Sequence, residues 1–423
     1  MACIFFKTII GILLVISLSC YAGIKSTSSQ DSNAVKKHVQ TGAEVLLQKY
    51  LSIIKDKRVG LVCNQTTVLP DGTHLVDTLR SLGITITALF GPEHGIRGTE
   101  AAGETFDNNR DKKTGIPIYS LYGKTKKPTP EMLKDVDILI FDIQDIGSRY
   151  YTYVSTMAYC MESAAENHKK FIVLDRPNPI NGKNLEGTVL DPAFKSFIGM
   201  FPIPVRHGMT LGELAKMIVG EKWMDNIKDI DLTIITMDNW NRNLWFDETS
   251  LAWIPPSPNM KTLATATVYP GTCLFEGTNV SEGRGTDKPF EFIGAPWINA
   301  DTLASTLNLE KHAGVKFENI EFTPRSDSIA APNPKYKNVK CGGVFVHVTD
   351  RDKFQPFETA IAMLHAIHAC YPEKFKISKD SFEHLIGINI LDQQGNLDEN
   401  IDLQHITDDI NAFQAKRIKY LLY

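Results

Sequence analysis

The hydrophobic residues of this chain form short runs that alternate with segments of helical spacing. Five apolar runs, each followed by polar residues, are expected as strands at 58–63, 84–90, 136–141, 171–175 and 232–236. Three segments with apolar residues at helical spacing are expected as helices at 73–82, 153–168 and 211–220. Strands that alternate with helices and are apolar on both faces predict an α/β fold with a Rossmann-like, doubly wound and mostly parallel sheet.

This alternation weakens after the proline-rich run 255–258. Further along the chain, two apolar runs and one helical pattern predict two strands and a helix, at 315–322, 342–348 and 356–368. We therefore expect a larger Rossmann-like domain over residues 43–289, which carries the chemistry, and a smaller α+β C-terminal domain over residues 290–423.

The first residues have the pattern of an export signal. Lys7 precedes an apolar run at 9–18, which small residues and then a polar stretch follow. The run is shorter than the ~20 apolar residues that a membrane-spanning helix needs. We therefore expect a signal peptide over residues 1–22 and a linker over residues 23–42, with no stable insertion in a membrane.

Two processing routes fit this signal. Ala22 suits the small residue that precedes a cleavage site. Cys20 is the candidate for a lipid anchor, although Ser17 stands where bacterial lipoproteins usually have leucine, so plain cleavage is favoured. Both routes export the protein, and we expect it to be periplasmic or secreted.

Composition and missing motifs exclude several classes of ligand. The formal net charge is −4 and no long run of like charge occurs, so no nucleic-acid partner is expected. The cysteines beyond the signal segment form no Cys-x-x-Cys pair and no zinc pattern, which predicts no metal site and favours buried free thiols. No phosphate loop, dinucleotide fingerprint or Gly-x-Ser-x-Gly elbow occurs either, so no cofactor is expected and a serine esterase is disfavoured.

Polar residues gather where the expected strands end. Ligands of open α/β sheets bind outside the carboxyl ends of the strands. The residues found at these ends are Asn64, Glu93, His94, Asp142, Gln144, Asp145, Arg176 and Asn178. Their recurrence at equivalent points of successive strand–helix units predicts one polar site at this edge of the sheet.

The most unusual of these strand ends is the loop 91–95, Gly-Pro-Glu-His-Gly. Its glycines allow close approach of the backbone to a ligand, and its proline stiffens the turn. A carboxylic acid held here is suited to protonate a leaving oxygen. The alternative is that Glu93 caps the following turn or pairs with Arg97.

Three further segments offer binding groups. In 142–151, alternation sends Asp142 and Gln144 to one side and Asp145 to the other, and Arg149 offers a planar fork for a carboxylate. The alternative is that Asp145 caps a helix while Tyr150 and Tyr151 belong to the core. The segments 206–207 and 276–287 add candidates for recognition, with structural roles as the alternative, namely Arg206, His207, Glu276, Asn279, Glu282 and Arg284.

Four motifs together resemble a known family. The strings at 91–98, 142–151, 175–179 and 276–285 are similar, in this order, to those of the NamZ-type exo-β-N-acetylmuramidases. The resemblance implies a Rossmann-like N-terminal domain, a smaller C-terminal domain and an active site in the cleft between them. It also implies release of terminal N-acetylmuramic acid from the non-reducing end of peptidoglycan fragments, with Glu93 as the catalytic residue.

Glycosidases usually need a second carboxylate besides the proton donor, although a substrate with a 2-acetamido group can supply its own nucleophile. The sequence leaves this choice open, with Asp142, Asp145, Glu276 and Glu282 as the candidates. A bidentate partner for the lactyl carboxylate is expected among Arg149, Arg176, Arg206 and Arg284.

Two other classes of function stay open from the sequence. One is a non-catalytic binder of wall sugars, and the other is a wall esterase or metal-dependent amidase. Turnover of a chromogenic N-acetylmuramide distinguishes the first, and sensitivity to EDTA the second. On the hydrolase interpretation, the catalytic candidates are Glu93, His94, Asp142 and Asp145, and the substrate-binding candidates are Asn64, Arg97, Gln144, Arg149, Tyr150, Tyr151, Arg176, Asn178, Arg206, His207, Glu276, Asn279, Glu282 and Arg284.

Overall fold

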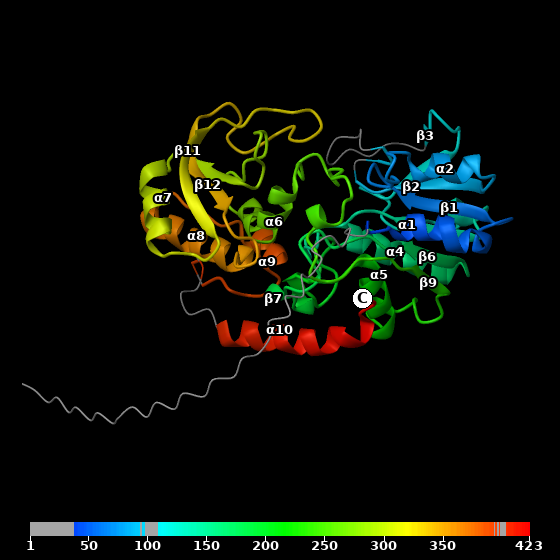
Figure 1. Cartoon of the computed structure of the whole chain (residues 1–423). Coiled ribbons are helices and arrows are strands. Elements are labelled where there is room, and N and C mark those ends of the chain that lie inside the picture. The colour runs from blue at the N-terminus through cyan, green and yellow to red at the C-terminus, as the bar shows by residue number, and fades with distance from the viewer. Residues whose placement is uncertain (1–37, 94, 98–108, 393, 396, 398–402) are drawn as a thin grey trace, which may run out of the picture. The chain divides into compact units, whose positions relative to one another are not determined.

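The computed structural model describes residues 38–93, 95–97, 109–392, 394–395, 397 and 403–423 (Figure 1). The expected signal peptide, residues 23–37 of the expected linker and the candidate His94 lie outside the described residues. Residues 38–42 are described and belong to the fold, since Val39 is buried and Gly42 N donates to the carbonyl of Asp175. No helix among those described is both long enough and apolar enough to cross a membrane.

A seven-stranded sheet underlies the N-terminal part, in the order β3-β4-β2-β1-β5-β6-β9. Its strands are β1 (Arg58–Cys63), β2 (Thr85–Gly91), β3 (Asn109–Arg110), β4 (Pro117–Ser120), β5 (Ile138–Asp142), β6 (Lys170–Leu174) and β9 (Leu232–Ile235). All pairs are parallel except β3 with β4. The predicted doubly wound, mostly parallel sheet is confirmed, with β3 and β4 added to the five strands that the apolar runs predict.

The sheet is buried on both faces because its strands are apolar throughout. In β5, Ile138 and Ile140 join one hydrophobic core, while Leu139 and Phe141 join another on the opposite face. The helices of this part are α1 (Gly42–Val45), α2 (Leu75–Ser81), α3 (Pro130–Leu133), α4 (Tyr153–Glu166) and α5 (Leu211–Gly220). Thr210 caps α5 as its sequence predicts, since its hydroxyl accepts from Glu213 N.

A three-stranded antiparallel sheet forms the smaller C-terminal part, in the order β10-β12-β11. Its strands are β10 (Phe292–Ala295), β11 (Val315–Phe322) and β12 (Cys341–Val348), and its helices are α6 (Leu263–Thr272), α7 (Ala300–Leu309), α8 (Pro356–Cys370) and α9 (Lys379–Ile386). The predicted α+β character of this part is confirmed. Helix α6 packs closely on α8, because a Cβ at Gly271 would lie 1.8 Å from the carbonyl oxygen of Pro356.

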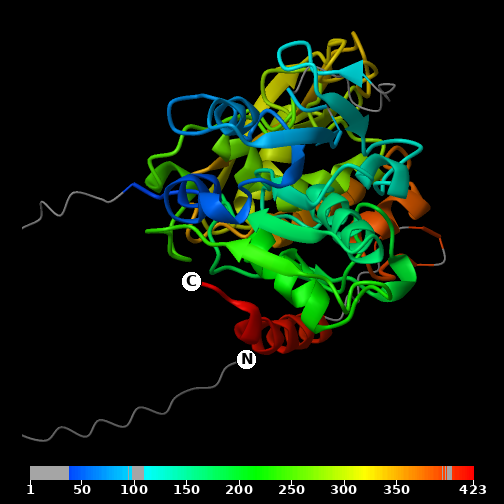
Figure 2. The ribbon, with the colours of Figure 1, turned by 90° about the vertical axis from the view of Figure 1, so that its right-hand side faces the viewer.

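Residues after 402 return to the N-terminal part. Helix α10 (Leu403–Arg417) contacts β7 (Glu186–Val189), and the 3-10 turn η6 (Ile418–Tyr420) contacts α5 (Figures 1 and 2). Arg417 Nη1 donates to the carbonyl of Gly208 at 2.8 Å, and the hydroxyl of Tyr423 donates to Asp175 Oδ2 at 2.7 Å. Helix α10 therefore packs on the N-terminal part and not on the three-stranded sheet. The predicted domain boundary between residues 289 and 290 stays a prediction.

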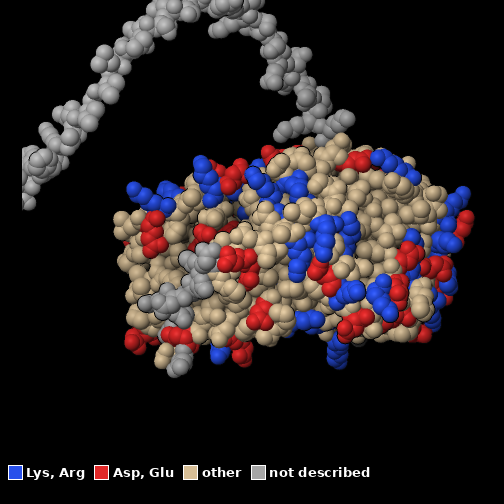
Figure 3. Space-filling view, turned by 90° about the horizontal axis from the view of Figure 1, so that it is seen from below, with Lys and Arg blue, Asp and Glu red and all other residues tan. Residues whose placement is uncertain are grey.

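The remaining short elements are the helical turns η1 (Leu46–Tyr50), η2 (Leu51–Ile53), η3 (Pro192–Phe194), η4 (Phe246–Glu248) and η5 (Cys273–Gly277), and the strand β8 (Pro204–Arg206), which pairs with β7. Acidic and basic side chains are interspersed on the face that carries α10 (Figure 3). The five cysteines of the described residues are free, and four of them are buried, as their apolar surroundings in the sequence predict.

Glu186, at the start of β7, joins the two parts. Its Oε1 accepts from the backbone nitrogens of Phe357 and Glu358, at 2.7 and 3.3 Å, at the beginning of α8. Burial raises the pKa of Glu186 to about 7, although the charge of Arg206 and these two hydrogen bonds oppose the rise.

This raised pKa predicts a stability that falls with pH. The folded protein holds the Glu186 proton more tightly than the unfolded chain, whose carboxyl group has a pKa of 4.5. The contribution to the free energy of unfolding is complete below the unfolded value and is lost as the pH rises through about 7. At 1.36 kcal/mol per pKa unit, it amounts to about 3 kcal/mol. Urea unfolding between about pH 5 and pH 7 should therefore show stability decreasing with pH.

Glu186→Gln is the variant that tests this origin, because glutamine keeps an oxygen acceptor for Phe357 N and does not titrate. We expect the variant to lose most of the slope. A residual slope of the same sign is expected from Asp175 and Glu213, whose pKa values burial also raises. An unchanged slope in the variant contradicts the assignment.

Candidate active site

A cavity of about 260 Å³ lies where loops at the carboxyl edge of the large sheet meet the segment 257–290. It is lined by Glu93, Tyr122, Tyr150, Tyr151, Thr152, Tyr153, Phe197, Ile198, Ser257, Asn259, Met260, Tyr269, Glu276, Arg284 and Phe290. Five of the predicted site residues are thus brought to one cavity, namely Glu93, Tyr150, Tyr151, Glu276 and Arg284. The lining combines aromatic rings with two carboxylates and one guanidinium, which suits a polar ligand with apolar faces.

Glu93 stands in a tight turn directly after β2. The turn is closed by Gly95 N, which donates to the carbonyl of Pro92 at 3.0 Å. The hydroxyl of Tyr122 lies beside the Glu93 carboxylate. Burial, the negative charge of Glu93 and a hydrogen bond to it together raise the pKa of Tyr122 to about 12. Tyr122 therefore stays protonated at neutral pH and can donate to Glu93.

The alternative interpretation of Glu93 as the partner of Arg97 is not what the structure shows. Arg97 instead makes a two-pronged ion pair with Asp111, from Nε to Oδ1 and from Nη2 to Oδ2, both at 3.0 Å. Asp77 lies 3.8 Å from the same guanidinium. Arg97 is thereby occupied outside the cavity, and Glu93 remains available to a ligand.

Asn64 acts on the cavity through Tyr153. Asn64 Nδ2 donates to the hydroxyl of Tyr153 at 3.0 Å, and that hydroxyl donates to the carbonyl of Pro256 at 2.6 Å. The ring of Tyr151 meets the ring of Tyr153 edge to face, with 4.9 Å between centroids. Asn64 is a positioning residue for this aromatic wall.

Glu276 and Arg284 line the same cavity as Glu93 and form an ion pair with each other. Arg284 donates from Nε and Nη2 to Glu276 Oε1, at 3.1 and 2.6 Å. Behind them, Glu282 Oε1 lies 3.5 Å from Arg284 Nε, and Glu282 Oε2 lies 3.0 Å from Lys335 Nζ. Burial lowers the pKa of Arg284, but the charges of Glu276 and Glu282 outweigh it and hold that pKa above its ordinary value.

Asp145 and His207 lie behind the tyrosine wall and do not line the cavity. Asp145 Oδ2 accepts from Gly147 N at 2.8 Å, and its Oδ1 is buried without a partner. His207 Nδ1 accepts from Met209 N at 3.3 Å, so a neutral ring carries its proton on Nε2, which faces Asp145 Oδ2 at 3.7 Å. The charge of Asp145 helps to raise the pKa values of Tyr151 and Tyr153, after the larger effect of their burial.

Asp142 and Arg176 are partners of each other. Arg176 donates from Nε to Asp142 Oδ1 and from Nη2, at 2.9 Å, to Asp142 Oδ2, and both side chains are buried. Asp142 ends β5 inside the protein and Arg176 follows β6. The pair therefore joins the ends of the two strands. Neither side chain is free for catalysis or for binding a lactyl carboxylate.

Four other candidates also hold the protein's own backbone. The carbonyl groups that they bind belong to Pro177 for Gln144, Met209 for Asn178, Ile180 for Arg206 and Lys374 for Asn279. None of the four lines the cavity. Their amide and guanidinium groups hold the loops around the site together, so each of the four has a structural role.

Arg149 is likewise absent from the cavity lining. Its Nη1 donates to the carbonyls of Thr188 and Ile203, and its Nη2 donates to those of Leu385 and Ile386, both at 2.8 Å. Burial lowers its pKa to about 10, and it remains charged at neutral pH. Arg149 therefore ties the N-terminal part to the end of α9 and is not free to bind a carboxylate.

Several lining residues escaped the sequence analysis. Tyr122 follows the short strand β4, which no long apolar run in the sequence predicts. The sequence pattern places Tyr153 in a helix but does not indicate that it lines a site. Ser257 lies in the proline-rich run 255–258, and Asn259 follows it directly. Their common signal is a polar or aromatic residue in an irregular segment, which is too frequent to single out. Among the described residues, no three His, Cys, Asp or Glu side chains converge as metal ligands.

Comparison with known proteins identifies relatives whose matched segments include all the residues that line the cavity. Family models described as "Exo-beta-N-acetylmuramidase NamZ", N-terminal and C-terminal, match residues 59–264 and 267–423. The chain is 47% identical to "Peptidoglycan beta-N-acetylmuramidase NamZ" of Bacillus subtilis (strain 168) over 424 residues, which cover 99% of this chain and 100% of that protein.

Two solved structures share the fold, both described as DUF1343 family proteins from Bacteroides fragilis NCTC 9343. One has a TM-score of 0.83 at 36% identity, covering 91% of this chain and 99% of that one. The other has a TM-score of 0.74 at 36% identity, covering 92% and 99%. The cavity draws on both matched segments, since Glu93 lies in the first and Glu276 in the second.

Arg149→Lys should destabilise the fold. A lysine keeps the charge but has no planar fork, so it cannot reach carbonyls on both sides as Arg149 does. Each buried carbonyl left without a donor costs ~1–3 kcal/mol, and we expect a loss of about that size in the free energy of unfolding, measured by urea denaturation. The control is Arg110→Lys, because Arg110 is exposed and donates to one carbonyl, that of Gly115. Equal stability of the two variants contradicts the assignment.

Proposed function

This chain belongs to the NamZ family of exo-β-N-acetylmuramidases, and on that basis we propose that it removes terminal β-linked N-acetylmuramic acid from the non-reducing end of peptidoglycan fragments in the cavity of Glu93. One observation carries the assignment of the site. Among the described residues, Glu93 and Glu276 are the two carboxylates of the lining, and they come from the two segments that the family models match. Hydrolysis of a glycosidic bond usually requires two such groups.

Glu93 is the proton donor in this proposal. No described cation pairs with its carboxyl group, and Tyr122 donates to it from one side. The tight turn after β2 fixes its position at the sheet edge, where the leaving oxygen of a bound glycoside can reach it. A positioned carboxylic acid contributes typically ~10²–10⁴-fold to such a reaction.

Glu276 is the carboxylate that faces the sugar from the opposite segment. Its ion pair with Arg284 holds its carboxylate in place at the cavity. A negative charge there stabilises the positive charge that develops on the sugar ring in the transition state. Asp145, whose Oδ1 is buried and has no hydrogen-bond partner among the described residues, is the alternative candidate for this role.

Arg284 is our choice among the four arginines for the lactyl carboxylate. Arg149, Arg176 and Arg206 are all committed to protein groups away from the cavity. Arg284 lines the cavity and stacks over the ring of Phe290 at 5.0 Å. Its bonds to Glu276 use Nε and Nη2, which leaves Nη1 for a ligand oxygen.

We further propose that the protein acts outside the cytoplasm. The support is the signal pattern of residues 1–22, which lie outside the described residues. Such a location would give it access to wall fragments, and the choice between cleavage after Ala22 and lipid attachment at Cys20 belongs to the same proposal.

Glu93→Gln should lower kcat by about 10²–10⁴-fold on the natural disaccharide of N-acetylmuramic acid and N-acetylglucosamine. A nitrophenyl N-acetylmuramide has a better leaving group and should lose less. Release of the free sugar measures both rates, and circular dichroism checks the fold. The control is Glu131→Gln, which makes the same change at an exposed position of α3. Near-normal turnover of the disaccharide by Glu93→Gln rules out Glu93 as the acid.

Arg284→Lys should raise the KM for a chromogenic N-acetylmuramide strongly, since an ammonium group does not reproduce the planar fork. The unaltered enzyme should turn over the matching N-acetylglucosaminide much more slowly, because that sugar has no lactyl carboxylate. The comparison variant is Arg149→Lys, which we expect to change stability and leave KM unaltered. Equal rates on the two glycosides, or an unaltered KM in Arg284→Lys, contradict this reading of the lactyl group.

A further inference from the structure

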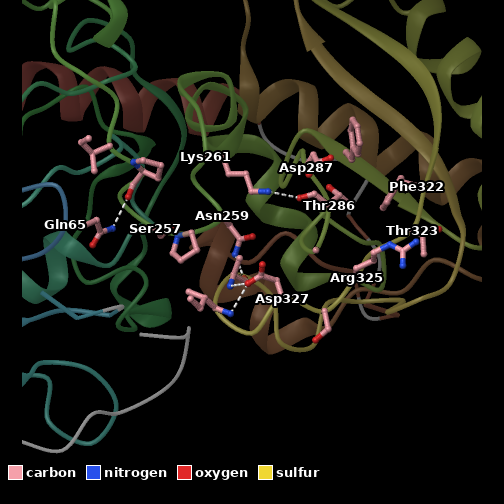
Figure 4. A pocket seen from close by; sticks show the side chains of 18 residues that line it. Gln65, Ser257, Asn259, Lys261, Thr286, Asp287, Phe322, Thr323, Arg325 and Asp327 are labelled. Atoms are coloured by element: carbon pink, nitrogen blue, oxygen red, sulfur yellow. Dashed lines mark hydrogen bonds between the residues drawn. The ribbon is translucent and has the colours of Figure 1, made fainter. Parts of the chain in front are cut away.

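A second cavity, of about 840 Å³, opens beside the cavity of Glu93 (Figure 4). The two share Ser257 and Asn259 in their linings. The larger cavity is formed by Gln65 and by side chains from three segments, 254–261, 285–292 and 322–330. The two cavities therefore adjoin at Ser257 and Asn259.

The loop that follows β11 is anchored to the rest of this lining. Arg325 N donates to the carbonyl of Gly285 at 2.8 Å, and Asn259 Nδ2 donates to the carbonyl of Ala330. Gly285 has a φ of +79°, and a Cβ there would lie 2.3 Å from the carbonyl oxygen of Arg325. Asp327 Oδ1 accepts from the backbone nitrogens of Ile329 and Ala330, at 2.9 and 2.7 Å, which folds the tip of the loop. The cavity wall is thus held by specific contacts.

The lining of the large cavity offers two cations to a ligand. Lys261 Nζ donates to the carbonyl of Thr286 at 3.0 Å, and within the described residues it makes no ion pair. The side chain of Arg325 is exposed and makes no ion pair with a described residue either. The same lining also carries two carboxylates, since Asp327 uses its Oδ1 in the loop's own turn and Asp287 is exposed. Phe292 and the largely buried Phe322 (labelled in Figure 4) make part of the cavity wall apolar.

We infer that this cavity binds the remainder of the glycan, with Lys261 and Arg325 recognising the carboxylate of the second muramyl unit. The inference rests on the proposed function, because it places the terminal N-acetylmuramic acid at Glu93. The next sugar of a peptidoglycan strand is N-acetylglucosamine, which has no carboxylate, and the sugar after it carries a lactyl group again. A volume of about 840 Å³ lies toward the upper end of ligand pockets, ~300–1,000 Å³, and exceeds the neighbouring cavity more than threefold.

The carboxylate has two chemical sources. In a bare glycan it is the lactyl carboxylate itself, and in a peptide-bearing fragment that group is an amide, with carboxylates further along the peptide. Both present an anion to the same two cations. Selectivity for fragments longer than a disaccharide follows in either case, because only those fragments reach Lys261 and Arg325.

The test compares kcat/KM on a nitrophenyl N-acetylmuramide, on the disaccharide and on the tetrasaccharide with two muramyl units. We expect the unaltered enzyme to prefer the tetrasaccharide to the disaccharide. Arg325→Gln and Lys261→Gln should each reduce this preference, together by about tenfold, as hydrogen bonds to charged groups are lost. Neither variant should change the rate on the two shorter substrates. Lys337→Gln, at an exposed position of the same loop outside the lining, is the control.

The outcomes separate this inference from the proposed function. If the enzyme cleaves the short substrates but prefers neither the bare nor the peptide-bearing tetrasaccharide, or if Arg325→Gln and Lys261→Gln keep the preference, the inference is wrong and the function stands. If the nitrophenyl N-acetylmuramide and the disaccharide are not cleaved at all, the proposed function fails first. A tetrasaccharide with a peptide on its second muramyl unit distinguishes the sources, since a preference found only with the peptide assigns recognition to peptide carboxylates.

Discussion

Burying the carboxyl edge of a parallel sheet forces every polar group there to find a partner, and much of this structure answers that requirement. The strands β1, β5 and β6 all end at this edge inside the protein. An unpaired buried donor or acceptor costs ~1–3 kcal/mol, so polar side chains must be neutralised by their neighbours or by a ligand. Asp142 pairs with Arg176, Asn64 donates a hydrogen bond to Tyr153, and Asn178 donates one to a backbone carbonyl. The site consists of the groups that this pairing leaves over.

The same requirement explains how far the sequence could be interpreted. Apolar runs and their polar ends predict the parallel sheet and the edge where Glu93 lies, because both follow from local pattern. Whether an arginine binds a ligand or the protein depends on which backbone reaches it. Arg149 donates to the carbonyls of Leu385 and Ile386, which lie more than two hundred residues away in the sequence. No local sequence pattern predicts these contacts. Tyr122 and Ser257 were missed for the complementary reason, since the fold alone brings their irregular segments to Glu93.

Charge is distributed unevenly between the two sides of the cavity. Glu93 comes from the large sheet and has no described ionic partner, whereas Glu276 comes from η5 and shares a network with Arg284, Glu282 and Lys335. Two carboxylates in one cavity are thereby placed in different electrostatic surroundings. Such asymmetry is what acid and base roles require of two chemically similar groups.

The return of residues 417–423 to the large sheet has a consequence for synthesis on the ribosome. Asp175 follows β6 and is buried, yet one of its hydrogen-bond donors is the hydroxyl of Tyr423. Arg417 likewise supplies a donor to the carbonyl of Gly208, beside the start of α5. The large sheet is translated before these residues, so Asp175 and the carbonyl of Gly208 lack these donors until a segment more than two hundred residues later has been made. The final packing of the large sheet therefore depends on that later segment.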